Sequence, residues 1–538
     1  MASPRPSDRR TELSWSGWGD PNAASALPEA VLELLRGALG ITDPTPAPSS
    51  ISGLELTPVR LAPETGELLA RVVGEANASS DHEARARHAL GKSTLELLAL
   101  RAGETISAPD LVLAPGSHEE IIKLLELCSE HRVAVVPFGG GTSVVGGLTP
   151  DANEFAGVVA VDLRRLNALL ELDQESRLAV LGPGLRGPEA EALLADRGYT
   201  IGHFPQSFEF ATLGGFAAAR SSGQASAGYG RFDELVAALK VATPAGTLTL
   251  GRAPKSAAGP DLRQLMLGSE GTLGVITELT IRVKPVPERR VYEGWRLNSF
   301  DRGAATLRRL VQDGPVPTVL RLSDEAETAL GLARPAGLGQ SEGGGCLAIV
   351  GYEGTAGDVQ GRRAAAGEVL RAAGASPVEQ AGEAWARDRY RGPYLRDSLL
   401  DAGALVETLE TATFWSSLGG LYEAVGTALR ESLTAQGTPP VVLCHISHVY
   451  PDGGSLYFTV ASAQLPDPIE QWRLAKAAAS EAIVAVGASI THHHGVGRDH
   501  REWLPAELGQ LGVAVLDAVK QTLDPAGILN PGVLFAPR

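Results

Sequence analysis

Cysteine, long apolar runs and excess positive charge are all scarce in this chain of 538 residues. Its three cysteines, Cys128, Cys346 and Cys444, lie far apart in apolar surroundings. We interpret them as buried thiols, so neither a disulfide framework nor a metal cluster is implied. The formal net charge of -16 argues against nucleic acid as a partner, because a phosphate backbone needs clustered Lys and Arg. An anionic small molecule stays compatible with this charge if a few arginines focus the field locally.

The absence of long apolar segments bears on location. No apolar run reaches the roughly 18 residues of a membrane span, and residues 1–10 lack the apolar core of a signal peptide. The basic residues are mostly Arg, and Gly and Ala are abundant, which is typical of a GC-rich bacterial genome. We therefore expect a bacterial cytoplasmic protein, with peripheral contact to a membrane left open.

The length is too great for one hydrophobic core and predicts several domains. Hydrophobic periodicity divides the chain into four zones: residues 1–105, 106–287, 288–480 and 481–538. The first zone has a helical pattern at 27–40 and a Pro/Ser-rich linker at 43–53, which predicts an N-terminal helical segment. The second alternates apolar strands with helices, as α/β domains do, and the third mixes the two as an α+β domain. The fourth carries a His triplet, one helix and a tail.

A glycine-rich loop follows the apolar run that ends at Pro137-Phe138. It reads Gly139-Gly140-Gly141-Thr142-Ser143. Because glycines lack a Cβ, such a loop can turn its N–H groups inward and bind a diphosphate, with the two hydroxyls as extra donors. A glycine-rich turn without a ligand is the alternative reading.

A second glycine motif, at residues 182–187, matches the G-x-G-x-x-G pattern of dinucleotide-binding folds. It stands between a strand pattern and a helix pattern, as that motif requires. Its Pro183, however, removes one of the N–H donors that a phosphate would need. We therefore disfavour an NAD site here.

Four segments in this order and spacing resemble the FAD-binding half of the vanillyl-alcohol-oxidase type flavoproteins: PFGGGTS (137–143), QSFEFAT (206–212), ARSS (219–222) and EGTLGVI (270–276). The resemblance implies that the second segment lies under the isoalloxazine ring and that the fourth closes the adenine side. The residues it assigns to the cofactor are Pro137, Phe138, Gly139, Gly140, Gly141, Thr142, Ser143, Gln206, Ser207, Phe208, Glu209, Phe210, Ala211, Thr212, Ala219, Arg220, Ser221, Ser222, Glu270, Gly271, Thr272, Leu273, Gly274, Val275 and Ile276. No His stands in or beside the glycine loop, so we expect FAD to be bound non-covalently.

Almost the whole chain resembles one branch of these flavoproteins, the alkyldihydroxyacetonephosphate synthase family. SWSGWGD at 14–20, LRDSLLDAGALVETLETATFW at 395–415 and SITHHHGVGRDHREWL at 489–504 carry this resemblance. It implies an α+β fold class, with a two-subdomain FAD-binding domain, an α+β substrate (cap) domain and an N-terminal helical segment. It implies ether lipid synthesis without net oxidation or reduction, in which the acyl chain of acyl-dihydroxyacetone phosphate is exchanged for a fatty alcohol. It also implies a homodimer.

The catalytic candidates are Tyr450 and the triplet His492-His493-His494. Tyr450 matches the tyrosine acid/base of the family. In a strand, His492 and His494 would project to one face and His493 to the other, and imidazoles titrate near neutral pH, which suits proton transfer.

Two arginines, Arg321 and Arg396, match family arginines and are the candidates for binding substrate, because guanidinium offers a bidentate geometry for phosphate or carboxylate. The alternative interpretation of Arg396 is an ion pair with Asp397 or Glu407 on a surface helix, without a role in binding. The alternative interpretation of Tyr450 is an aromatic residue of the core without a catalytic role.

The His triplet has two alternative readings, a metal site completed by His500 or a buried structural cluster. In the rival FAD-dependent D-2-hydroxy-acid dehydrogenases, strand histidines and a Glu belong to motifs that can hold a divalent metal. Those positions are Tyr450, Tyr457 and His493 in this chain. Because these replacements remove most of the metal ligands, we expect no metal.

Other features favour the rival. The tail at 529–534 is closer to the dehydrogenase ending, and Gln206 and Ser222 differ from residues associated with the synthases. A D-2-hydroxy-acid dehydrogenase or oxidase is therefore the alternative function. A flavin-fold binding protein without activity is disfavoured, because the polar catalytic candidates are intact.

Overall fold

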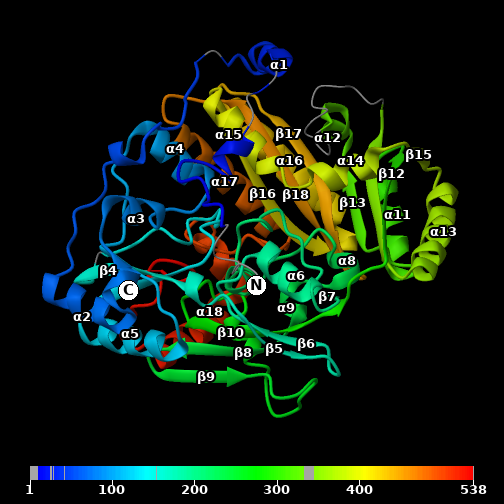
Figure 1. Ribbon diagram of the computed structural model, residues 1–538. Coiled ribbons are helices and arrows are strands. Elements are labelled where there is room, and N and C mark those ends of the chain that lie inside the picture. Colours follow the sequence, from blue (N-terminus) through cyan, green and yellow to red (C-terminus); the bar gives the residue numbers. More distant parts are fainter. Residues whose placement is uncertain are drawn as a thin grey trace.

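The computed structural model describes residues 10–24, 27, 29–41, 43–152, 154–331 and 344–536 (Figure 1). The first nine residues of the predicted N-terminal segment lie outside this part. Three larger sheets and one two-stranded pair organise the described chain.

The first sheet has the order β1-β2-β4-β3. Its strands are β1 (Ala78–Ser79), β2 (Leu111–Leu113), β3 (Val133–Phe138) and β4 (Gly157–Asp162). The last three pair in parallel, because the helix α5 (His118–Glu130) carries the chain from β2 back to the start of β3. Residues Val133 to Val136 have no exposed surface, as expected for a parallel strand that is covered on both faces. The other helices of this part are α2 (Pro63–Val73), α3 (His82–Arg87) and α4 (Thr94–Ala102).

The second sheet is antiparallel, with the order β5-β6-β10-β8-β9. Its strands are β5 (Leu169–Asp173), β6 (Leu178–Leu181), β8 (Val236–Thr243), β9 (Gly246–Leu250) and β10 (Val275–Arg282). The helices here are α6 (Gly187–Ala195), α7 (Leu213–Ala218), α8 (Ser226–Tyr229), α9 (Phe232–Leu235) and α10 (Arg263–Met266), and β7 (Tyr199–Thr200) pairs with β11 (Lys284–Pro285). The alternating pattern that predicts an α/β domain thus holds for the first sheet only, because short hairpins join β5 to β6 and β8 to β9.

The second glycine motif, at residues 182–187, joins β6 to α6 as predicted, but its backbone amides donate to other parts of the protein. Gly182 N donates to Ala168 O and Gly184 N to Leu166 O, each at 2.9 Å. A Cβ on Gly184 would lie 2.0 Å from Leu163 O. The glycines therefore serve close backbone packing, and a dinucleotide phosphate would find these donors occupied.

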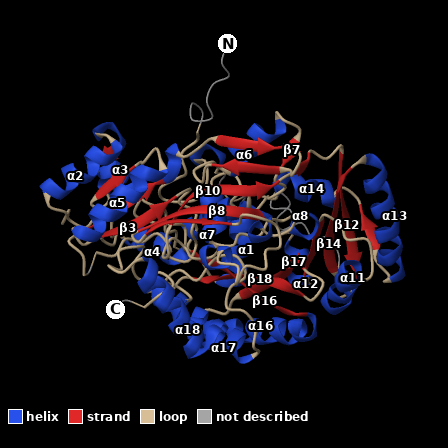
Figure 2. Ribbon diagram, turned by 90° about the horizontal axis from the view of Figure 1, so that it is seen from below, coloured by secondary structure: helices blue, strands red, loops and turns tan. Residues whose placement is uncertain are grey.

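The third sheet has seven antiparallel strands in the order β15-β12-β14-β13-β17-β18-β16. These are β12 (Arg289–Leu297), β13 (Val319–Ser323), β14 (Cys346–Gly354), β15 (Ser376–Val378), β16 (Ala404–Phe414), β17 (Val441–Val449) and β18 (Gly453–Ala463). Its helices are α11 (Phe300–Gln312), α12 (Glu325–Leu330), α13 (Ala356–Ala372), α14 (Ala381–Asp388), α15 (Gly392–Asp401), α16 (Leu418–Ala435) and α17 (Pro468–Ala485). Figure 2 shows α16 and α17 side by side along β16 and β18. The largest hydrophobic core lies between this sheet and its helices.

Both ends of the described chain contact elements that are far away in the sequence, β16 and β3. The predicted N-terminal helix is present as α1 (Glu29–Leu39), and its Val31 and Leu35 pack against Ala404 and Val406 of β16. After α18 (Leu504–Leu523), the tail bonds to β3 at Val135, whose N donates to Ile528 O at 2.8 Å. The predicted domain boundaries stay predictions, although elements of the first and last zones join the first sheet. No helix in the described ranges has the length and apolarity that crossing a bilayer requires.

Candidate functional site

A cavity of about 480 Å³ lies between the first two sheets and the seven-stranded sheet. The glycine loop and the turns before α7 and β10 line one side. The helix α15 and the strands β16, β17 and β18 line the other side, together with His493 and His494. The cavity therefore joins the predicted cofactor segments to the predicted substrate residues.

The glycine loop leaves its N–H groups available. In the described part of the chain, the amides of residues 139–143 donate to no protein acceptor. Gly141 has φ +71°, which a side chain rarely adopts, and a Cβ on Gly140 would lie 2.2 Å from Phe210 O. Unpaired amides on a cavity wall form an anion site, so the loop fits the diphosphate of FAD.

Most of the predicted cofactor residues line this cavity. Those that do are Pro137, Phe138, Gly139, Gly140, Gly141, Thr142, Ser143, Gln206, Ser207, Ala211, Thr212, Ala219, Ser221, Glu270, Gly271, Gly274, Val275 and Ile276. The described residues that stand behind the wall are Phe208, Glu209, Phe210, Arg220, Ser222, Thr272 and Leu273. Phe210, for example, packs edge-on against Trp18. The assignment of both groups of residues to the cofactor stays a prediction.

The close packing of Gly140 gives the first prediction. In Gly140→Val the side chain would press on the backbone of Phe210 and Ala211, because a Cβ at this position would lie 2.2 Å from Phe210 O and 2.8 Å from Ala211 Cα. Overpacking of this kind costs about 1–3 kcal/mol, which corresponds to roughly 5- to 150-fold weaker FAD binding. Flavin absorbance per mole of purified protein measures the effect. Gly361→Ala on α13, where a Cβ meets nothing within 4 Å, is the control, and normal flavin content in Gly140→Val would refute the loop assignment.

The His triplet lies in an irregular loop, so the strand-like alternation of its side chains is wrong. His493 and His494 both line the cavity, whereas His492 is buried and faces Tyr450. The physical reason is that one carboxylate, that of Glu410 on β16, accepts all three backbone amides. Their N atoms lie 2.6, 2.8 and 2.8 Å from its oxygens. These bonds replace a strand ladder.

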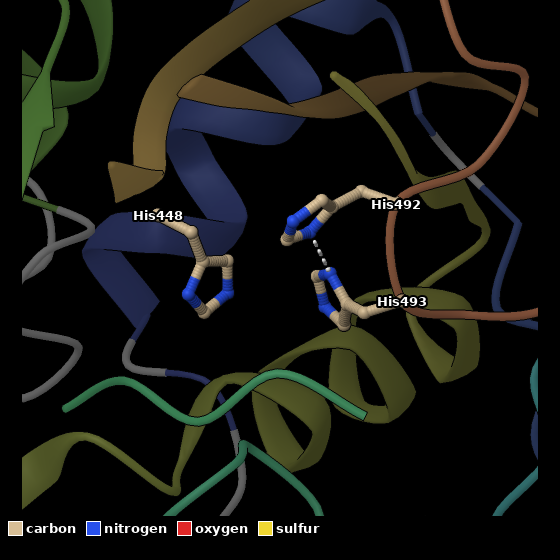
Figure 3. A group of neighbouring side chains, drawn as sticks. All are labelled: His448, His492 and His493. Carbon is tan, nitrogen blue, oxygen red and sulfur yellow. Dashed lines mark hydrogen bonds between the residues drawn. The ribbon is translucent and has the colours of Figure 1, made fainter. Parts of the chain in front are cut away.

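Tyr450 and the triplet form a hydrogen-bonded chain. Tyr450 Oη lies 2.8 Å from His492 Nε2, and His492 Nδ1 lies 3.0 Å from His493 Nδ1 (Figure 3). Burial raises the pKa of Tyr450 to about 12 and lowers the pKa of His492 well below its usual range. Near neutral pH, Tyr450 therefore donates to a neutral His492, which can donate in turn to His493. Tyr450 is linked to the cavity through this chain rather than by lining it.

Figure 3 also shows His448 of β17 facing His492 and His493. One ring nitrogen from each lies within 4.8 Å of the others, close enough to share a metal ion. His448 Nδ1 is already hydrogen-bonded to Ser226 Oγ at 3.0 Å, and His492 uses both nitrogens in the chain above. These hydrogen bonds engage four of the six ring nitrogens in the group, and the absence of a metal stays a prediction. His500 is not part of this group of neighbouring nitrogens, and its Nδ1 lies 3.0 Å from Gly495 O.

The two predicted substrate arginines line the cavity and are paired. Arg396 donates from Nε and Nη2 to Asp397 Oδ1, at 3.0 and 2.9 Å, and from Nη1 to Lys92 O at 2.7 Å. The Asp397 pair of the alternative reading therefore exists, but it is buried at the cavity rather than exposed on a surface helix. The backbone amide of Trp18, in the SWSGWGD segment, binds the second oxygen of Asp397.

Arg321 donates to Glu327 through Nη2, and the same nitrogen lies 3.1 Å from His445 Nδ1. The other oxygen of Glu327 lies 2.9 Å from His445 Nδ1. These contacts hold the pKa of Glu327 below its usual range even though burial raises it. Sequence reasoning missed Glu327, His445 and His448. It also missed Glu410, which stands in the segment 395–415 of the resemblance but was given no role there.

Aliphatic side chains line part of the cavity, and we call this set of residues the apolar arm. They come from α1, α12, α15 and the strands β16, β17 and β18: Val31, Leu35, Ala38, Leu39, Leu330, Leu395, Leu399, Val406, Val441, Leu443 and Ala461. Such a wall offers an extended apolar group a dry surface and offers a charged group nothing.

Known proteins share this architecture. Family models match residues 109–251, as "FAD binding domain", and residues 286–534, as "FAD linked oxidases, C-terminal domain". The chain is 33% identical to alkyldihydroxyacetonephosphate synthase of Dictyostelium discoideum, over 98% of this chain and 94% of the relative. It is 31% identical to that of Trypanosoma brucei brucei, over 98% and 93%. A solved alkyldihydroxyacetonephosphate synthase superposes with a TM-score of 0.80 at 32% identity, covering 97% of this chain and 98% of that one. These matches confirm the predicted fold class and FAD as the cofactor.

Proposed function

Because the chain belongs to the FAD-linked oxidases, as an alkyldihydroxyacetonephosphate synthase-like member, we propose that it makes ether lipid precursors. In this reaction the acyl chain of acyl-dihydroxyacetone phosphate is replaced by a fatty alcohol, and no net oxidation or reduction takes place. The proposal includes non-covalently bound FAD, which acid precipitation of the protein should release. It also includes a homodimer, which the molar mass from light scattering tests.

The apolar arm is the observation that carries the proposal. A fatty chain contributes about 0.8 kcal/mol for each buried CH₂, and the arm supplies the wall against which those groups can pack. A short hydroxy acid has no use for such a compartment. The arm also opens into the same cavity as the glycine loop and His493, so one end of a long substrate reaches the polar residues while its tail stays in the arm.

Each polar residue then has a role in the exchange. The amides of 139–143 would bind the cofactor diphosphate, and bound FAD would supply the reactive flavin ring system. Arg321 and Arg396 bind the phosphate and carbonyl oxygens. His493 and His494 accept the proton of the incoming alcohol and give one to the departing carboxylate. Tyr450 holds the chain through His492 in the protonation state that lets His493 accept and return a proton.

A direct assay tests the function. Purified protein is incubated with palmitoyl-dihydroxyacetone phosphate and hexadecanol, and ether product and released palmitate are measured. A parallel assay offers lactate, glycolate and 2-hydroxyglutarate with an artificial electron acceptor. Ether product that persists with EDTA supports the proposal. Flavin reduction by the hydroxy acids without ether product would make the protein a dehydrogenase, and loss of activity to EDTA would assign a metal to the His448 cluster.

The arm gives the second prediction. Ala461→Phe places a ring on β18 where the side chain lines the cavity. Excluding about four methylenes removes roughly 3 kcal/mol of burial, so kcat/KM for hexadecanol should fall on the order of 10²-fold. Butanol, which does not reach that depth, should be used as well as before. Ala514→Phe at an exposed position of α18 is the matched control, and an equal loss for both alcohols would remove the arm from the substrate path.

A further inference from the structure

Two carboxylates, one buried and one partly buried, bind the loop that carries the His triplet. Glu410 of β16 is 2% exposed, and Glu270 stands in the turn before β10. Glu410 binds the amides of the triplet as described above and also the hydroxyl of Thr491, at 2.8 Å. Glu270 lines the cavity and belongs to a segment that the resemblance assigns to the cofactor, and both its carboxylate oxygens also accept hydrogen bonds from the loop.

Glu270 binds the second half of the loop. Its Oε1 accepts from Val496 N at 2.7 Å, and its Oε2 accepts from Gly497 N at 2.9 Å. A Cβ on Gly495, where φ is +93°, would lie 3.0 Å from this carboxyl group, so only glycine lets the chain pass this close. The backbone N–H groups of residues 492–494, 496 and 497 therefore all point to the two carboxylates.

This arrangement is unusual for a loop, because loop amides mostly bond to carbonyls, caps or water. An ionised carboxylate is costly to bury unless several donors surround it, and here each oxygen has at least one N–H partner within 2.9 Å. Burial raises the pKa of Glu410, but the neighbouring imidazoles outweigh it and hold this pKa well below its usual range. The bonds of Glu410 are therefore charge-assisted and about twice as strong as neutral ones. Burial raises the pKa of Glu270 to about 7, so its bonds have this character only in part near neutral pH. The loop geometry is thus fixed by side chains from β16 and from the turn before β10 rather than by a ladder of its own.

We propose that Glu410 and Glu270 are the positioning residues of this loop, holding the rings of His493 and His494 toward the cavity from its two sides. Glu410 belongs to the seven-stranded sheet, and Glu270 to the turn beside the glycine loop. Because both carboxylates bind the same loop, the position of the triplet is fixed relative to the substrate side of the cavity and to its cofactor side. The effect on turnover rests on the proposed function, whereas the hold on the backbone does not.

Amide hydrogen exchange of the FAD-loaded wild-type protein tests the hold without any variant. The amides of residues 492–494, 496 and 497 should exchange as slowly as those inside β17, although they lie outside regular structure. In Glu410→Gln the amide group of the new side chain faces the loop donors, so residues 492–494 should exchange at least about tenfold faster. In Glu270→Gln the same should hold for residues 496 and 497. Rapid exchange in the wild-type protein would overturn the proposal even if neither variant folds.

Turnover provides the second measurement. A misplaced catalytic group costs on the order of 10²-fold, so Glu410→Gln should lower kcat by this amount with little change in KM and in flavin content. Glu410→Asp, which keeps the charge, should recover part of kcat. Glu353→Gln is the matched control, because that buried carboxylate binds the hydroxyls of Tyr229 and Tyr292 instead.

The two proposals fail separately. Protected amides without ether product from any form of the protein would leave the hold intact and remove the synthase function. Wild-type kcat in Glu410→Gln, measured alongside normal ether synthesis, would leave the function intact and remove the positioning role.

Discussion

Tyr450→Phe is expected to lower turnover by on the order of 10²–10⁴-fold, the range for loss of a general acid/base. The substitution removes one oxygen, the one that lies 2.8 Å from His492 Nε2. Without this hydroxyl, His492 Nε2 loses its hydrogen-bond donor. The hydrogen-bonded chain from Tyr450 through His492 to His493 is then interrupted. Flavin content should be unchanged, because Tyr450 does not line the cavity. Steady-state rates normalised to bound flavin measure the effect.

Tyr352→Phe is the matched control for this experiment. Tyr352 is fully buried on β14, and its hydroxyl has no hydrogen-bond partner among the described residues. Removal of that hydroxyl should leave turnover as it is. If Tyr450→Phe behaves in the same way, Tyr450 is a core aromatic and the proton chain has no part in catalysis.

Arg396→Lys should have the second large effect. Lysine keeps the charge but lacks the planar fork, so it cannot hold Asp397 and Lys92 O at once as Arg396 does. Loss of a charge-assisted pair from a buried site costs about 2–5 kcal/mol. We therefore expect kcat/KM for acyl-dihydroxyacetone phosphate to fall roughly 30- to 5,000-fold. The loss should appear mainly as a higher KM.

Arg363→Lys on α13 is the control, because that arginine is half exposed and pairs with Glu293 away from the cavity. Asp397→Asn separates two causes, since it leaves the guanidinium in place but weakens its support. An intermediate effect in Asp397→Asn would show that orientation matters. Unchanged kcat/KM in Arg396→Lys would mean that Arg396 only pairs with Asp397.

The cofactor segments were predictable because each is local. A glycine loop after a buried strand needs only its own residues to present N–H groups, and four such segments in order identify FAD. The pair of Arg396 and Asp397 was open to sequence reasoning for the same reason. The partners of the His triplet were not. Glu410 and His448 come from β16 and β17, and only the sheet brings them to the loop.

The strand alternation of the triplet failed for a related reason. Three consecutive residues with imidazole side chains give no periodicity, and their conformation depends on a carboxylate 82 positions away from His492. The helix α1 shows the same limit. Its apolar spacing predicted a helix, but nothing in residues 27–40 indicates that Val31 and Leu35 would cover β16 and help to enclose an apolar arm.

The tail that bonds to β3 has a consequence for how the chain folds as it is synthesised. β3 is the outermost strand of the first sheet, and residues 528–530 cover its free edge. Asn530 also donates to Gly147 O, 383 positions earlier. A nascent chain that has completed only the first two sheets therefore exposes an unpaired edge beside the glycine loop, and such edges pair readily with other chains. The seven-stranded sheet must emerge before that edge is covered, so the first sheet gains this edge contact only after residues 528–530 have been made.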